Sequence, residues 1–173
     1  MGRLGYLGLG FVLAFVLVAI GGYLFITLGG MPMATAAGAL PGEQMVAKMA
    51  LRASFKDSLD LKNPLPLNDD NLRGGADVYN GNCSLCHGAL DQKPPDLATA
   101  MFPHAPQLLV QGHMVADDPE GETYWKVTNG IRMTAMPAFG NILDDKRRWQ
   151  VTMLLSHADK LTPAARKQLL GPE

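Results

Sequence analysis

The sequence has only two cysteines, Cys83 and Cys86, in 173 residues. They stand three positions apart, which is too close for an ordinary structural disulfide. Because there is no third cysteine, we expect no lipid attached to an N-terminal cysteine. Any chemistry of the thiols is therefore expected to involve the pair as neighbours.

Charged residues are absent from Leu4 to Gly42, and the formal net charge of the whole chain is only −1. From Asn68 to the end there are 13 acidic and 10 basic residues, so this part is mildly acidic. No stretch interleaves basic and aromatic residues, as a nucleic-acid-binding surface would. The composition therefore excludes a nucleic-acid partner and a strongly charged one.

A run of 25 uncharged, mostly apolar residues extends from Leu4 to Leu28. At about 1.5 Å per residue, a helix of this length reaches roughly 37 Å and can cross a bilayer. Arg3 precedes the run and the next basic residue is Lys48, so the positive-inside rule places the N-terminus in the cytoplasm. We expect a single-pass protein of the bacterial inner membrane, with its body on the periplasmic side.

A cleaved signal peptide is the alternative reading of this run. Ala34-Thr35-Ala36 would serve as a cleavage site and leave a mature N-terminus near Ala37. The run is longer than the signal-peptide core of about 7–15 residues, which favours a retained anchor. Either outcome exports the body.

Three segments follow from these patterns. Residues 1–30 are predicted to be a transmembrane anchor, residues 31–67 a linker with a short helical segment, and residues 68–173 a separate domain. Within the linker, residues 42–59 can form an amphipathic helix that carries Met45, Met49 and Phe55 on one side. We see no chemistry in that helix and expect it to pack or act as a spacer.

The domain is predicted to be all-α, because it has helical caps and periodicity but no convincing strand or repeat. Asp69 or Asp70 suits the N-cap of a helix that runs to Tyr79. The stretch from Gly88 to Pro119 is expected to be loop. Later helices are expected at Glu122–Asn129, after an Asp144 cap, and after Thr162-Pro163.

The segment Cys83-Ser84-Leu85-Cys86-His87 fits Cys-x-x-Cys-His, the attachment signal of c-type haem. On one helical turn, both thiols can add to haem vinyl groups while His87 presents its imidazole to the iron. A thioredoxin-like pair would need a βαβ context, and a zinc site usually needs four ligands. The motif therefore predicts one covalent haem c, bound through Cys83 and Cys86.

Met136 is the expected second axial ligand. It precedes Pro137, which fixes an extended chain, and it lies between two expected helices. Met133 is the nearest competitor, and its side chain is expected to fill space in the core instead of binding the iron. His104 and His113 are rival ligands that would lower the reduction potential.

Two further residues could contact the haem. Trp125 could donate a hydrogen bond to a haem carboxylate, although it could equally be a core residue. Arg132 stands near the expected ligand loop and could pair with a carboxylate.

These motifs together resemble a class I c-type cytochrome over roughly residues 72–161. The resemblance is carried by the haem motif with the later Met136-Pro137-Ala138-Phe139, and it is supported by four further features. These are Gly75-x-x-x-Tyr79, Pro95-x-Leu97, Asn129-Gly130-Ile131 and Trp149.

The resemblance implies a domain of short helices wrapped round one haem, with His87 and Met136 ligating the iron. It also implies that the Pro95 carbonyl accepts the other ring N–H of His87, and that Leu97 belongs to the haem site. Gly75 and Tyr79 on the first domain helix would meet Trp149 and Met153 on a later one.

The function implied is electron transfer, either by a tethered shuttle or by a haem subunit of a respiratory membrane complex. We expect redox-protein partners and no small-molecule substrate. A haem enzyme or gas sensor with a vacatable sixth site is the alternative, and a structural haem subunit is a third possibility.

Overall fold

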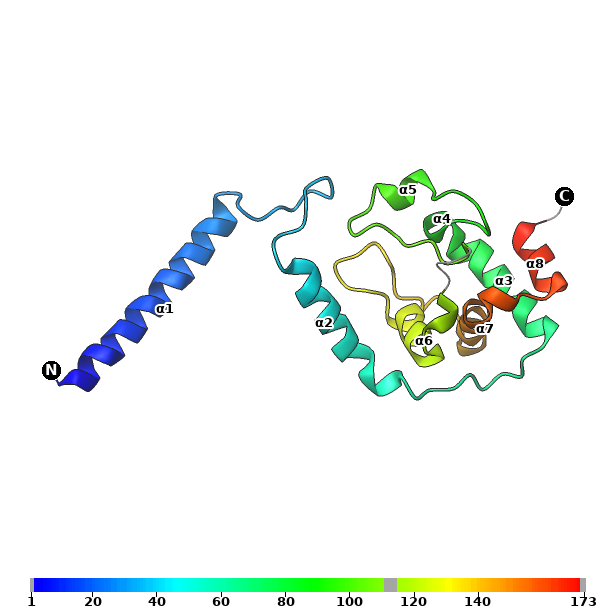
Figure 1. The fold of residues 1–173 in the computed structure, drawn as a ribbon, viewed down its shortest axis with the longest axis horizontal. Coiled ribbons are helices and arrows are strands. Elements are labelled where there is room, and N and C mark those ends of the chain that lie inside the picture. The colour runs from blue at the N-terminus through cyan, green and yellow to red at the C-terminus, as the bar shows by residue number, and fades with distance from the viewer. Residues whose placement is uncertain (1, 111–114, 172–173) are drawn as a thin grey trace. The chain divides into compact units, whose positions relative to one another are not determined.

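The computed structural model describes residues 2–110 and 115–171, and no strand occurs in these two ranges. The chain divides into two compact units, Met1–Gln44 and Met45–Glu173. Figure 1 labels the α-helices, and three short 3₁₀ helices (η) lie between them. In chain order the elements are α1 Arg3–Thr27, α2 Glu43–Phe55, η1 Lys56–Ser58, α3 Asp69–Asn82, α4 Ser84–His87, α5 Asp96–Thr99, η2 Val115–Asp117, α6 Glu120–Asn129, α7 Asp145–Ser156, η3 Ala158–Lys160 and α8 Pro163–Leu170.

The first unit contains α1, a 25-residue helix whose side chains are all exposed. It is long and apolar enough to cross a membrane, a test that a signal sequence also meets. The predicted apolar N-terminal helix is therefore confirmed.

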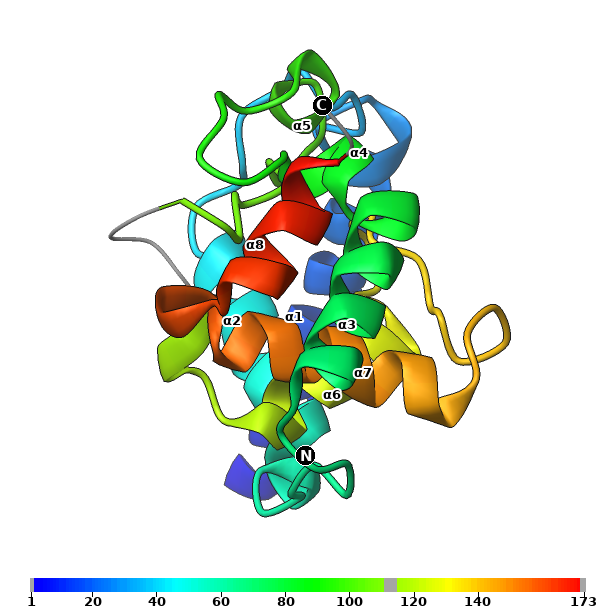
Figure 2. The ribbon, with the colours of Figure 1, turned by 90° about the vertical axis from the view of Figure 1, so that its right-hand side faces the viewer.

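The core of the second unit is the crossing of α3 and α7, with α8 packed on α3 and α6 on α7 (Figure 2). Gly75 allows the close approach, since a Cβ there would lie 2.3 Å from the Gln150 carbonyl oxygen and 2.9 Å from Leu154 Cβ. Gly75 and Tyr79 were expected to meet Trp149 and Met153, whereas the atoms nearest to Gly75 belong to Gln150 and Leu154, each one position further along α7. Trp149 instead stacks on Tyr124, with ring centroids 3.9 Å apart.

The helix caps agree with the sequence at two of three predicted places. The Asp144 carboxylate accepts from Arg147 N–H, and the Thr162 hydroxyl accepts from Ala165 N–H. At α3 the cap is Asn68, whose side chain accepts from Asn71 N–H, and not Asp69 or Asp70. The two aspartates occupy the first turn, where they still favour the helix dipole.

Residues 55–66 pack against the domain, and we call this segment the strap. Phe55 is buried, with its ring 6.2 Å from that of Trp125 on α6. It was expected on the same side of the helix as Met45 and Met49, but those two side chains are exposed, so that prediction was wrong. Gly121 on α6 lets the strap approach, because a Cβ there would overlap the Ser58 carbonyl oxygen. Asn63 Nδ2 donates to the Trp149 carbonyl at 3.0 Å. The sequence had suggested a linker over this segment.

The segment between α4 and α6 is mostly loop, as predicted, interrupted by α5 and η2. It carries the buried Leu90, Ala98 and Leu109. These side chains attach the loop to the helices, so it is an ordered part of the domain where the structure describes it.

Candidate functional site

The thiols and the imidazole of the haem motif share one helical turn. α3 leads directly into α4, and Cys83 is the N-terminal flanking residue of α4. The N–H groups of Cys86 and His87 both donate to the Cys83 carbonyl, at 3.1 and 2.8 Å. Both cysteines are free thiols, and both are half-buried. The local fold therefore brings the three groups together on one turn.

The His87 ring is oriented by the carbonyl of Pro106, which lies 2.7 Å from Nδ1. A carbonyl can only accept, so Nδ1 carries the proton and the lone pair resides on Nε2. Nε2 is therefore the nitrogen available to a metal. Such a hydrogen bond also fixes the orientation of the ring and makes Nε2 a stronger electron-pair donor to a metal.

The acceptor was expected at Pro95, and that prediction was wrong. Pro95 caps α5, and its carbonyl accepts from Ala98 N–H at 2.9 Å. Both prolines are followed at the second position by leucine, so the local pattern fits either. Leu108, after Pro106, packs against the core, whereas Leu97 is 44 % exposed.

The backbone after His87 is held by a buried tyrosine. Tyr79 Oη donates to the Gly88 carbonyl at 2.7 Å, and burial raises the pKa of Tyr79 well above its usual range. Gly88 has φ +79°, and a Cβ there would lie 2.4 Å from Gln107 Nε2. The positive φ favours glycine at this position, and a larger residue would also have to displace the Gln107 amide.

Burial also raises the pKa of the Cys83 thiol, to about 12, and the charge of nearby Cys86 adds to the shift. Cys83 therefore holds its proton near neutral pH. This is the behaviour of a thiol in apolar surroundings, unlike that of an activated redox cysteine.

The loop that carries Met136 is tied to the end of α6. Met136 N–H donates to Thr134 Oγ1 at 3.1 Å, and the Met136 carbonyl accepts from Ile131 N–H at 3.3 Å. Gly130, with φ +66°, ends α6 so close to this loop that a Cβ would lie 2.7 Å from Ala138 N. Met136 is partly buried in this fixed loop, whereas Met133 is 81 % exposed.

The remaining candidates lie in different settings. Trp125 is partly buried beside Phe55, and Arg132 and His104 are exposed. The contacts of Trp125 and Arg132 with a haem carboxylate stay predictions. His113 lies outside the described residues.

The residues present fit a haem better than a bare metal ion. The described part of the chain holds no group of three or more His, Cys, Asp or Glu side chains arranged for a metal, so the zinc reading gains no support. A haem needs only one imidazole and two thiols from the motif. Beside them, Gln107 Nε2 is buried and finds no hydrogen-bond partner among the described residues, as expected of a donor that faces a polar group of a cofactor.

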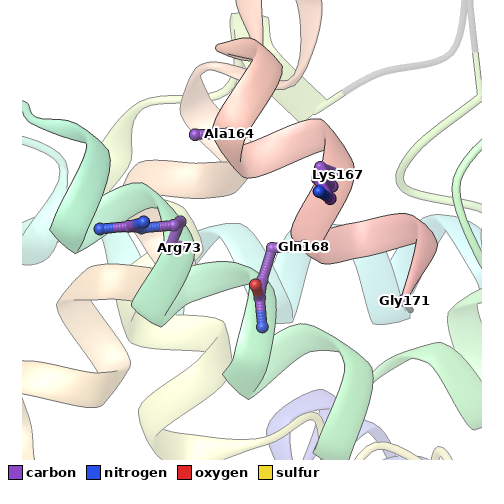
Figure 3. A pocket seen from close by; sticks show the side chains of 5 residues that line it. All are labelled: Arg73, Ala164, Lys167, Gln168 and Gly171. Carbon is purple, nitrogen blue, oxygen red and sulfur yellow. The ribbon is translucent and has the colours of Figure 1, made fainter. Parts of the chain in front are cut away.

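One surface pocket lies between α3 and α8 and contains none of the predicted site residues (Figure 3). It is lined by Arg73, Ala164, Lys167, Gln168 and Gly171. Arg73 is paired with Asp70, and the Gln168 amide donates to Asp77.

A sequence model of the family described as cytochrome c oxidase, cbb3-type, subunit III matches residues 70–153. The match begins in α3 and ends in α7, so it includes the Cys-x-x-Cys-His motif and Met136. No curated protein matches the chain.

Proposed function

Since residues 70–153 form a class I c-type cytochrome domain, we propose that this chain is a single-haem electron-transfer protein held in the membrane by α1. The observation that carries the proposal is His87, whose Nδ1 is engaged by Pro106 while two free thiols stand on the same turn. That combination suits covalent attachment and axial ligation together.

Cys83 and Cys86 would form the two thioethers, and His87 Nε2 and the Met136 sulfur would ligate the iron. When bound, the haem iron gains and loses a single electron. Met136 is favoured over Met133 because both its N–H and its carbonyl are hydrogen-bonded and its side chain is partly buried.

The surrounding residues keep this arrangement unchanged during electron transfer. The Pro106 carbonyl fixes the His87 ring, Tyr79 holds the Gly88 carbonyl, and Thr134 holds the Met136 backbone. Small changes of geometry between the two redox states favour fast electron exchange, and each of these bonds limits movement of one ligand.

The partners are redox proteins or subunits of a respiratory complex on the periplasmic side of the bacterial inner membrane. The family description names an oxidase subunit, and the α1 anchor would keep this chain in the same membrane as such a complex. Anchoring raises the effective concentration of a weakly docking redox partner.

Spectroscopy of the purified full-length protein tests the proposal. We expect red protein whose pigment resists acidified acetone, with a methionine-to-iron band in the ferric state. Met136→His should abolish that band and lower the reduction potential. Met133→His, three residues away, is the matched control and should retain both.

Colourless protein would overturn the assignment. Immediate binding of carbon monoxide by the reduced protein would instead favour the haem enzyme or gas sensor, because it requires an open sixth position.

A further inference from the structure

One side of α2 carries apolar side chains that nothing in the described structure covers. Met45, Val46 and Met49 are 63 %, 61 % and 64 % exposed. At 3.6 residues per turn they share one face with Ala50 and Ala53, which are also exposed. Isolated exposed apolar residues are ordinary, but a continuous face of them marks an interaction surface.

Basic residues line one edge of this apolar face. Lys48 and Arg52 are one helical turn apart, and Lys56 follows in η1. On the far side of the helix, the terminal residue Phe55 is turned to α6, where its ring lies 6.2 Å from that of Trp125. An apolar face with a Lys/Arg margin is the pattern of a helix that lies in the interface of an anionic bilayer.

A membrane surface is also within reach of this helix. Only residues 28–42 separate α1 from α2, and none of the 15 is charged. Fully extended, they span about 50 Å at most. With α1 in a bilayer, the start of α2 can therefore lie no more than about 50 Å from the end of α1.

We propose that α2 binds the surface of that bilayer through its apolar face and its basic edge, with anionic phospholipid as the partner. The inference rests on the proposed retention of α1. Since the strap joins the end of α2 to α6 and α7, binding would restrict the orientation of the haem domain towards the membrane.

Photo-crosslinking in intact membranes tests the partner directly. A benzophenone amino acid replaces Met49 in the full-length chain, and a second variant carries it at Leu170, an exposed apolar residue of α8 that serves as control. We expect phospholipid adducts at position 49 and few at position 170. Protein adducts alone at position 49, or none, would overturn the proposal in favour of a protein partner or a free face.

Hydrogen exchange tests the role of charge. The full-length haem protein is placed in nanodiscs of phosphatidylcholine alone or with phosphatidylglycerol. Exchange of peptides from α2 should slow at least threefold with the anionic lipid, less so in Lys48→Gln/Arg52→Gln, and not at all in Met45→Glu/Met49→Glu. Equal exchange in both discs would contradict the proposal.

Two checks keep this outcome separate from the proposed function. The haem spectrum tests the proposed haem protein, and the intact mass reports whether α1 is retained. If the protein is red and keeps α1 but gives no lipid adducts, the proposed lipid binding by α2 is wrong while the proposed function stands.

Discussion

At the residue scale, Gly75 sets how closely α3 and α7 can approach. The obstacle to a larger residue is the Gln150 backbone, which cannot rotate away as a side chain could. We expect Gly75→Ala to lower the free energy of unfolding by about 2 kcal/mol, the usual cost of overpacking. Chemical denaturation of the haem protein, followed by far-UV circular dichroism, measures it.

Gly81 on the same helix provides the control, because nothing lies within 4 Å of a Cβ there. Gly81→Ala should leave the stability unchanged or raise it by up to about 1 kcal/mol through helix propensity. Similar effects of the two substitutions would contradict the close approach at Gly75.

Tyr124 makes stability depend on alkaline pH. Its pKa is raised above 10.0 by burial and by the hydrogen bond that its hydroxyl donates to Asp145. The unfolded chain releases this proton first, so the contribution to stability is complete below pH 10 and is lost as pH rises through the folded-state pKa. Tyr124→Phe keeps the stack on Trp149 and should flatten the decline in unfolding free energy between about pH 9 and 11.

The decline should not vanish in that variant, because burial raises the pKa of Tyr79 in the same direction. An identical slope in wild type and Tyr124→Phe would show that Tyr124 ionises equally in the folded and unfolded chain.

At the scale of elements, the strap depends on Phe55. We expect Phe55→Ala to cost about 3 kcal/mol of local stability, since it removes a buried aromatic ring beside Trp125. Tryptic cleavage after Arg52 and Lys56 should then accelerate roughly tenfold or more, because local opening becomes frequent.

Met49→Ala is the matched control on the same helix, at an exposed position. It should change stability by no more than about 0.5 kcal/mol. Equal cleavage rates in the two variants would mean that Phe55 does not hold the strap.

Elements with local signals could be predicted from the sequence. The caps at Asp144 and Thr162 and the turn at Gly130 depend on residues next to each helix end. The choice between Pro95 and Pro106 has no such signal, because both begin Pro-x-Leu. Only the folding of the loop decides which carbonyl reaches His87, and that is a tertiary property. The strap could not be predicted for the same reason, since Asn63 hydrogen-bonds to, and Phe55 packs against, groups more than 50 residues away.

At the scale of the whole molecule, the anchor makes a prediction about the mature protein. We expect the haem protein to stay in the membrane pellet after an alkaline carbonate wash, because about 20 apolar residues suffice to span a bilayer. Its intact mass should equal that of the chain with α1 still attached, plus one haem. A soluble protein that begins near Ala37 would show that α1 is a signal peptide.

The sequence also indicated the class of the whole molecule, because the haem motif and the apolar run each depend on a few adjacent residues. The close α3–α7 crossing was foreseen through Gly75, but its register was not. A shift of one residue along α7 changes the neighbours of Gly75 without altering any local pattern.

The strap and α2 shorten the flexible connection between α1 and the haem domain. If the chain were free from Leu28 to Leu67, its 40 residues could extend about 140 Å, whereas the 15 residues before α2 and the helix itself together extend about 70 Å. With α1 retained in the membrane as proposed, the space that the domain can reach shrinks roughly eightfold, and its effective concentration for neighbours in the same membrane rises by that factor. If the proposed function holds, a redox partner in the same membrane would therefore have an advantage over one that diffuses freely.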